Sequence, residues 1–346
     1  DGLFLVESRY ALNNVYLDIF GLLGQLFFLI ALSQQKQRRW LTLALSGVFF
    51  GASACIKWNG LWFLLGVYMV WVAAWVMQWV RTRLNTPESE VKNGKLLKTP
   101  LQNLTQLNVF HMLWNFAIIP VLTYSLLWIP HLQMNPTPGF WEAQKEILVF
   151  HEKIGDGPKV HPYCSRWYSW ILMWRPVAYF YQTARNTTEQ VPAYPPLPGG
   201  VGQVVYDVHA IGNPFLWWLS TAAIFLLVLL LAVRFLEGVG WKLPPTPHTW
   251  IALYLVLNWL AHLLPWVRVT RCTFLYHYMG ASVFSGLALA WLVDRWLHSK
   301  HLHYRSAGFT VITVVLLAFV FWLPIYLGLP ISVKGYQIRM WFSSWI

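Results

Sequence analysis

The sequence predicts an all-α, polytopic membrane protein with about eight transmembrane helices and one long outer loop. The chain of 346 residues is 57% hydrophobic and only 11% charged, whereas soluble domains average about 25% charged residues. Its apolar residues fall in long runs, most of which approach the roughly 20 residues needed to cross a hydrocarbon core. Because the backbone inside a bilayer must satisfy its own hydrogen bonds, we expect these runs to be helices.

The candidate spans share this length and apolar character, and they are the segments 10–32, 41–57, 59–80, 110–130, 213–234, 249–266, 273–293 and 307–328. They divide the chain into three parts. Residues 1–130 hold the first helix group, with a polar linker at 81–106 that contains Pro87 and Gly94. Residues 131–212 form the long loop, and residues 213–346 hold the second helix group and an outer tail.

The distribution of positive charge predicts the orientation of the chain. The net charge is +12, and one set of short loops, which includes the linker, carries most of the loop Lys and Arg residues. Because short cytoplasmic loops are rich in Lys and Arg, this set is expected to be cytoplasmic, and the long loop and both termini are expected outside. The same distribution fits membrane orientation better than a nucleic-acid-binding stripe.

The long loop is expected to be functional. Loops of this length are usually either functional or disordered, and its Trp and Tyr content argues against disorder. Residues 151–182 combine aromatic rings at headgroup depth with polar groups that face water. The Pro- and Gly-rich tract 191–203 is expected to be an extended cover over the outer face.

Cations at the outer ends of the spans form the candidate binding site. Arg9 and Lys57 are each compatible with a membrane-interface anchor that only snorkels to the headgroups. Arg268 and Arg271 are expected on one helix face, followed by Tyr276 and His277. Two guanidiniums at a membrane edge suit a lipid phosphate, although snorkelling remains an alternative here too.

Other polar residues are less specific. His161 and Tyr163 flank Pro162 in a rigid turn, and no second ligand at zinc-like spacing accompanies the histidine, so we predict no metal site. The cysteines Cys55, Cys164 and Cys272 show no metal-binding spacing, and their odd number guarantees no closed disulfide set. The carboxylates expected outside the membrane show no paired pattern. Asp18 lies inside the first span and is therefore a functional candidate.

Five blocks, in the same order, resemble the protein O-mannosyltransferase family over essentially the whole chain. They are DGLFLVESRYALNNVYLDIFGLLGQ, CIKWNGLW, HEKIG…HPYCSRWYSWILMWRPVAYFY, IGNPFLWW and RCTFLYHYMGASVFSGLALAWLVDRW. The family consists of membrane glycosyltransferases of the GT-C type. The resemblance implies transfer of mannose from a polyprenyl-phosphate mannose donor to Ser or Thr of exported proteins, with inversion and without a cofactor.

The resemblance also implies positions for the donor-binding residues. The predicted set is Arg9, Lys57, Asn59, His161, Tyr163, Arg268, Arg271, Tyr276 and His277. Of these, Arg9 matches the DG…SR motif, where the family implies either a structural role or a donor-site role, and Arg268 is included on its position at the membrane edge. The Asp-Glu motif that supplies the catalytic base in the family lies upstream of the region where this chain begins. We therefore expect an N-terminally truncated sequence that is inactive alone, and we assign no catalytic residue.

The resemblance leaves the partners and the location as predictions. The long loop is too short for the β-trefoil module of eukaryotic members, so a bacterial-type enzyme of the plasma membrane is expected. The predicted partners are the lipid donor, exported acceptor proteins, membrane lipid and a possible dimer partner, with no nucleic acid. The alternatives are another GT-C transferase with a different sugar or lipid acceptor, and a transporter, which the clustering of polar residues at one face argues against.

Overall fold

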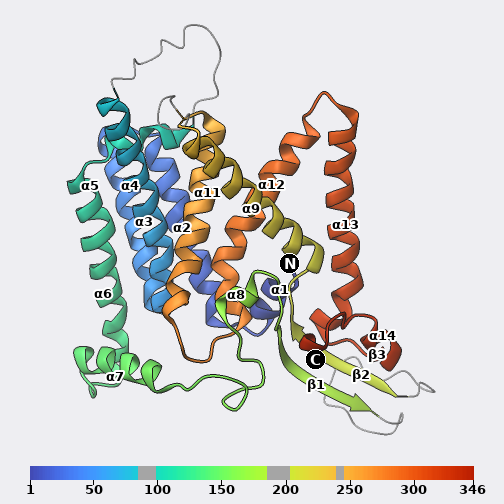
Figure 1. Ribbon diagram of the computed structural model, residues 1–346. Coiled ribbons are helices and arrows are strands. Elements are labelled where there is room, and N and C mark those ends of the chain that lie inside the picture. Colours follow the sequence, from blue (N-terminus) through green and yellow to red (C-terminus); the bar gives the residue numbers. More distant parts are fainter. Residues whose placement is uncertain (85–98, 185–202, 239–244) are drawn as a thin grey trace.

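The computed structural model describes residues 1–84, 99–184, 203–238 and 245–346. Long helices dominate it and run between two ends of the molecule (Figure 1). The long helices are α2 (Asn13–Leu32), α3 (Lys36–Ile56), α4 (Leu61–Arg83), α6 (Ile119–Met134), α9 (Pro214–Leu236), α11 (Pro247–Leu263), α12 (Met279–Leu297) and α13 (Leu302–Leu327). The helical, polytopic class predicted from the sequence is confirmed.

Among the described residues, seven helical segments are long and apolar enough to cross a membrane. They begin and end close to seven of the predicted spans. One of them joins α5 (Val109–Leu113), the π-helical turn η3 (Trp114–Ile118) and α6, and another joins α11 to the 3-10 helix η4 (Leu264–Arg268). The predicted span 41–57 is a full helix that begins five residues earlier, at Lys36.

The remaining predicted span, 273–293, differs from the structure. Its helix α12 begins only at Met279, after the 3-10 helix η5 (Leu275–Tyr278), and it is not among the seven apolar segments. The backbone before it cannot continue a helix, because Ser165 N–H donates to the Thr273 carbonyl at 2.8 Å and Thr273 Oγ1 donates to the Ser165 carbonyl at 2.6 Å. The prediction that Arg268 and Arg271 share one helix face is therefore wrong.

The long loop contains more structure than the sequence analysis expected. It holds α7 (Phe140–Lys153), the short helix α8 (Trp167–Trp170), and the antiparallel strands β1 (Val177–Ala184) and β2 (Val204–Ala210). The C-terminal strand β3 (Ile331–Ser332) pairs with β2, which makes a three-stranded sheet in the order β1-β2-β3. Most of the predicted cover segment 191–203 and of the linker 81–106 lies outside the described residues.

The shorter elements complete the chain. They are α1 (Gly2–Arg9), the 3-10 helices η1 (Trp58–Gly60), η2 (Pro100–Gln106) and η6 (Ser343–Trp345), and α14 (Val333–Gln337). The start of α9 follows standard capping chemistry, because Asn213 Oδ1 accepts from Leu216 N–H at 3.2 Å and Pro214 occupies the first turn.

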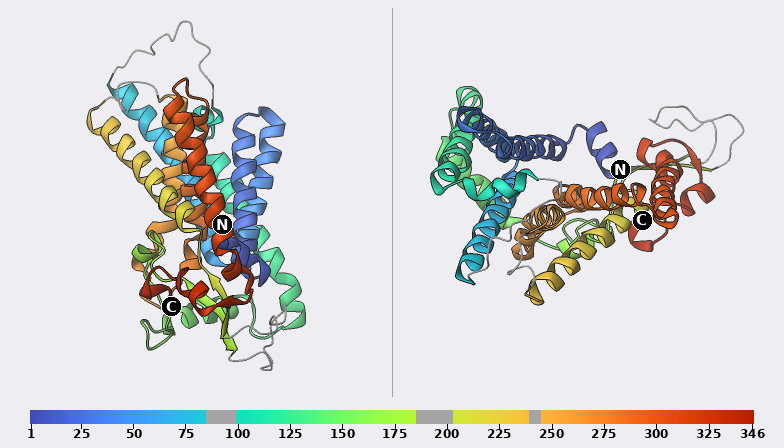
Figure 2. Two further views of the ribbon diagram at one scale, coloured as in Figure 1. Left: turned by 90° about the vertical axis from the view of Figure 1, so that its right-hand side faces the viewer. Right: turned by 90° about the horizontal axis from the view of Figure 1, so that it is seen from above.

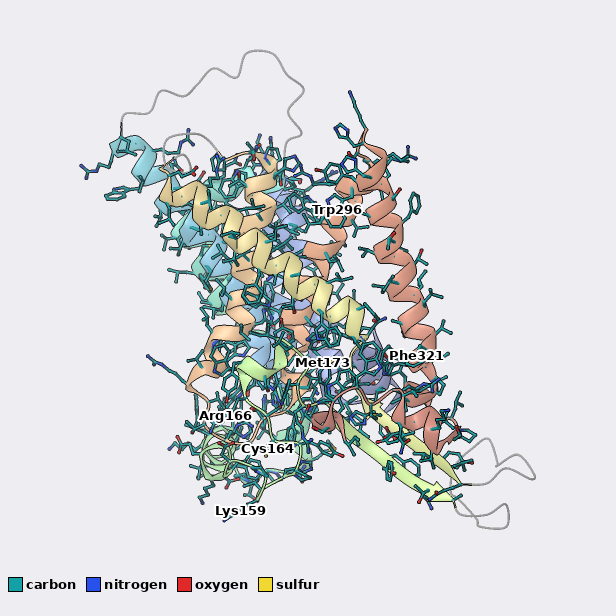
Figure 3. All side chains as sticks on the ribbon, turned by 45° about the vertical axis from the view of Figure 1, so that its right-hand side comes forward. Lys159, Cys164, Arg166, Met173, Trp296 and Phe321 are labelled. Carbon is teal, nitrogen blue, oxygen red and sulfur yellow. A yellow bond between two sulfur atoms is a disulfide. The ribbon has the colours of Figure 1, made fainter. Side chains whose placement is uncertain are left out.

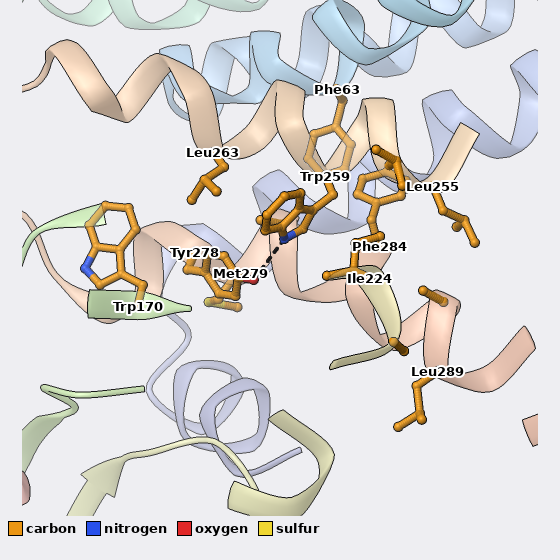
Figure 4. Packing of buried hydrophobic residues seen from close by; sticks show 14 of the residues in the cluster. Phe63, Trp170, Ile224, Leu255, Trp259, Leu263, Tyr278, Met279, Phe284 and Leu289 are labelled. Carbon is orange, nitrogen blue, oxygen red and sulfur yellow. Dashed lines mark hydrogen bonds between the residues drawn. The ribbon is translucent and has the colours of Figure 1, made fainter. Parts of the chain in front are cut away.

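The packing of the helices determines where the candidate site lies. In the view from above, the N-terminal helices (blue to teal) and the C-terminal helices (orange to red) form two neighbouring groups (Figure 2). Helix α4 packs against α11, and α12 packs against α9, α11 and α13. Large buried side chains join the C-terminal group, including Phe284, Trp259 and Tyr278, and Trp259 Nε1 donates to Tyr278 Oη at 2.9 Å (Figure 4).

The α7 helix, the sheet and the chain's C-terminal end lie at one end of the helix bundle, opposite the C-terminal end of α4 (Figure 1). Lys159, Cys164 and Arg166 lie at this end, whereas Trp296 lies near the other (Figure 3). We call it the loop end. The candidate site lies where the loop end meets the helices.

Candidate donor-binding site

A cavity with a volume of about 840 Å³ lies between α3, α4, α6, α7 and the segment after η4. Most of its wall is apolar, with Leu61, Phe116, Val121 and Trp141 among the lining residues. Hydrogen bonds between three polar side chains connect different elements of this wall. Trp58 Nε1 donates to Tyr124 Oη at 3.0 Å, and Tyr124 Oη donates to Gln144 Oε1 at 2.5 Å. An apolar wall of this kind suits a hydrocarbon chain.

One part of the cavity wall is cationic. Lys57 follows the end of α3, Arg268 ends η4, and Arg271 lies in the extended segment before η5. Asn59 and His277 line the same cavity. These five are members of the predicted donor-binding set, and the fold brings them together from segments about 200 residues apart. Such a combination of cations and apolar wall matches a lipid with an anionic head.

Lys57 is held by a network that the sequence analysis did not predict. Its Nζ donates to Asn14 Oδ1 at 2.9 Å, and Asn14 Nδ2 donates to Glu7 Oε2 at 2.9 Å. Tyr179 of β1 donates its hydroxyl proton to Glu7 Oε1. Burial lowers the pKa of Lys57, the Glu7 carboxylate raises it, and the Arg271 guanidinium lowers it. The Lys57 ammonium also lies 5.4 Å from the centroid of the Tyr276 ring.

Arg271 is positioned by its neighbour Cys272. Cys164 and Cys272 form a disulfide between segments 108 residues apart. Arg271 Nη1 donates to the Cys272 carbonyl at 3.1 Å, and Cys272 N–H donates to the Gly155 carbonyl at 2.8 Å. The odd number of cysteines therefore leaves one closed pair and one free thiol, Cys55 in α3.

His277 forms a neutral part of the wall. Its ring stacks on Trp170 at 5.9 Å and meets Trp266 edge-on at 4.7 Å between centroids. Burial lowers the pKa of His277 well below its usual value, and the Lys57 charge lowers it further. Tyr276, also predicted, lines a small adjacent cavity of about 10 Å³ rather than the main one.

Besides Tyr276, three residues of the predicted donor-binding set do not line the main cavity, so the fold does not gather the whole set around it. Arg9 is exposed and donates from Nη1 to the Tyr326 carbonyl at 2.7 Å, which ties α1 to the end of α13. His161 is also exposed, and its ring meets Phe274 at 5.1 Å between centroids. Tyr163 lies under the Arg175 guanidinium, 5.1 Å from the ring centroid. Arg9 is the last residue of α1 and binds the end of α13, and His161 packs against Phe274, so neither side chain lines the cavity.

The sequence analysis missed Glu7, Asn14, Tyr179 and His151 as site residues. His151, at the end of α7, lines the cavity. Burial lowers the pKa of His151, and the charges of Arg271 and Lys57 lower it further. In the sequence, Glu7 is one of the carboxylates that show no paired pattern. Its side chain is 0% exposed, and no spacing in the sequence indicates that β1 would cover it.

Asp18, a candidate because it lies inside a span, is 4% exposed. Its Oδ2 has no hydrogen-bond partner among the described residues, and neither has Nε2 of His262. Both residues line the small cavity of about 10 Å³ beside Tyr276. The structure thus places Asp18 beneath the cationic part of the main cavity rather than in it.

Two models of known protein families together match almost the whole chain. Residues 1–134 match the family model described as dolichyl-phosphate-mannose-protein mannosyltransferase. Residues 136–345 match the model for the C-terminal four-transmembrane region of protein O-mannosyltransferase.

Individual relatives are distant. The polyprenol-phosphate-mannose–protein mannosyltransferase of Corynebacterium glutamicum is 22% identical, covering 100% of this chain and 69% of the relative. Protein O-mannosyl-transferase 2 of Danio rerio is 31% identical over 38% of this chain and 19% of its own length.

Among solved structures, the Saccharomyces cerevisiae protein O-mannosyltransferase Pmt1–Pmt2 complex bound to the sugar donor is similar, with 22% identity and a TM-score of 0.48. That match covers 60% of this chain and 26% of the solved chain. Because the two family models together span residues 1–134 and 136–345, the chain belongs to the protein O-mannosyltransferase family.

Proposed function

We propose that this chain binds a polyprenyl-phosphate mannose donor in the cavity and transfers its mannose to Ser or Thr residues of exported proteins. The observation that carries the proposal is the placement of Lys57 and Arg271 in the wall of a mostly apolar cavity of about 840 Å³. Relatives from bacteria and yeast carry the names polyprenol- and dolichyl-phosphate-mannose–protein mannosyltransferase. Family membership does not favour a transporter.

In this proposal the isoprenoid chain lies along the apolar wall and the phosphate lies between Lys57 and Arg271. The acceptor hydroxyl attacks the anomeric carbon from the side opposite the phosphate as the carboxylate base that the family resemblance implies takes its proton, and the C–O bond to the phosphate breaks. The phosphate leaves with the bonding electrons. Fixed cations aimed at the phosphate stabilise the negative charge that grows on it, so they act more strongly in the transition state than before it.

The same proposal places the loop end outside the cell membrane, in a plasma-membrane protein. Disulfides form and persist in oxidising compartments, and Cys164–Cys272 lies at the loop end. Arg81 and Arg83, in the last turn of α4, lie at the opposite end, which fits a cytoplasmic location of that end. Acceptors in the course of export would then meet the enzyme on the side of the sheet and α7. Pairing with a second subunit remains a prediction.

Transfer of label tests this function directly. The full-length protein is incubated with radiolabelled polyprenyl-phosphate mannose and an exported Ser/Thr-rich peptide, and an Ala-substituted peptide serves as the control acceptor. Label should enter only the Ser/Thr peptide. Label that stays off the peptide and enters a lipid would instead support a GT-C transferase with a lipid acceptor.

A further inference from the structure

Glu7 is an acidic side chain with 0% exposure at the loop end, and nothing described so far requires a charge there. A buried carboxylate costs free energy unless hydrogen bonds or opposite charges compensate it. Two hydrogen-bond donors and one cation compensate the Glu7 carboxylate. Tyr179 and Asn14 each donate to one carboxylate oxygen, and the Lys57 ammonium is the nearby cation.

The chemistry of the carboxylate fixes the direction of the whole network. An ionised carboxylate only accepts hydrogen bonds, so Asn14 must turn its Nδ2 toward Glu7. Its Oδ1 then faces the other way and accepts from Lys57 Nζ at 2.9 Å. Because an ammonium only donates, the opposite orientation of the amide would leave Lys57 facing a second donor.

Lys57 depends on its hydrogen bond to Asn14 because its side chain is flexible and its surroundings mostly disfavour a charged ammonium. Burial and the Arg271 guanidinium lower its pKa, whereas Glu7 and Asp18 raise it. The other titratable groups around it are Tyr276 and His277 of η5 and His151 of α7, and Tyr179 of β1 is bound to Glu7. Of the two carboxylates, only Glu7 is joined to Lys57 through Asn14 by hydrogen bonds among the described residues.

We propose that Glu7 is a positioning residue for donor binding, which holds Lys57 charged and aimed at the donor phosphate through the amide of Asn14. The inference rests on the proposed function, because it assumes that Lys57 binds this phosphate. Tyr179 extends the network to β1, so the hairpin of the outer loop contributes to the placement of a cation in the cavity.

The test measures the affinity of labelled polyprenyl-phosphate mannose for the full-length protein over a range of pH. Glu7→Gln keeps the size of the side chain but can also donate, so it no longer orients Asn14. Asn14→Ala cuts the network without altering the carboxylate, and Lys57→Met removes the cation. Glu146→Gln, an exposed residue of α7, is the matched control. Thermal unfolding of each variant identifies any that fail to fold.

We expect Glu7→Gln and Asn14→Ala each to weaken donor affinity about 10-fold, the scale of one hydrogen bond to a charged group. Because Glu7 raises the pKa of Lys57, the loss of binding at high pH should move to lower pH in Glu7→Gln. Adding Glu7→Gln to Lys57→Met should have little further effect, since the group that Glu7 positions is already absent.

Two results overturn the inference in distinguishable ways. If Lys57→Met weakens binding but Glu7→Gln leaves both affinity and pH dependence unchanged, or acts additively with Lys57→Met, Glu7 has only a structural role. If Lys57→Met itself leaves donor affinity unchanged, the proposed phosphate contact fails and the inference fails with it. Glu146→Gln should match the wild type in either case.

Discussion

The disulfide between Cys164 and Cys272 ties the long loop to the residue that follows Arg271, so one covalent bond fixes both the loop and a cation of the cavity. The segment containing Arg271 belongs to neither η4 nor α12 and has no helix of its own to hold it. Its position depends on Cys272 and on the pairing of Thr273 with Ser165. The long loop, which also contributes α7 to the cavity wall, therefore helps to shape the cavity.

Replacing the disulfide should reduce both stability and donor affinity. The bond closes a loop of 108 residues, and disulfides typically contribute about 2–4 kcal/mol to stability. We expect the pair Cys164→Ser/Cys272→Ser to lower the unfolding temperature and to weaken donor binding, measured on the purified full-length protein with and without reductant. Cys55→Ser, at the free thiol in α3, is the control. If the double Ser variant unfolds at the same temperature as the wild type, the structural role of the disulfide is contradicted.

Two glycines in long helices should respond oppositely to alanine. A Cβ at Gly66 of α4 would lie 2.0 Å from Asn258 Oδ1, which accepts a hydrogen bond from Gln25 Nε2. Gly66→Ala should therefore displace the Asn258 amide and cost about 1–3 kcal/mol. At Gly286 of α12 no heavy atom lies within 4 Å of the added carbon.

Gly286→Ala should leave stability unchanged or raise it by about 0.5–1 kcal/mol, because alanine favours a helix over glycine. Thermal unfolding of the two variants beside the wild type measures the difference. If Gly286→Ala loses as much stability as Gly66→Ala, the clash of the added carbon with Asn258 of α11 is not the cause of the loss at Gly66.

His277 should make stability depend on pH. Its pKa in the folded protein lies well below the ordinary value of 6.5, because burial and the Lys57 charge disfavour the imidazolium. Above pH 6.5 the ring is neutral in both folded and unfolded chains, so its contribution to stability is fully present. As the pH falls below 6.5 the unfolded chain binds the proton first, and stability declines toward the folded pKa.

The measurement compares unfolding temperatures at neutral and mildly acidic pH. His277→Gln should show a smaller decline on acidification than the wild type. His298→Gln, at an exposed histidine after α12, should keep the wild-type decline. An identical pH dependence in the wild type and His277→Gln would contradict the assignment of a buried, neutral His277.

The sequence predicted those features that depend on local composition. The spans follow from apolar length, and Lys57 and Arg271 follow from cations at the outer ends of apolar runs. The sheet was missed because β1 and β2 are short aromatic and β-branched runs inside a region read as a loop. Glu7 and its contact with Tyr179 were missed because these residues are 172 positions apart and no local pattern connects them.

The family resemblance correctly identified the class of enzyme but not which side chains meet. Arg9 lies in a recognisable motif, yet its guanidinium binds the backbone of α13 at Tyr326 rather than lining the cavity. The direction of this side chain depends on a contact with a residue 317 positions away, which a motif does not record.

Donor binding by an Arg271→Ala variant tests the central claim most directly. Arg166→Ala is the matched control, because Arg166 lies at the same end of the molecule but pairs with Asp156 outside the cavity. With labelled polyprenyl-phosphate mannose and the full-length protein, Arg271→Ala should bind at least about 10-fold more weakly, since it loses a charge-assisted contact. Arg166→Ala should bind like the wild type. Equal affinity in the two variants would contradict a phosphate site in the cavity.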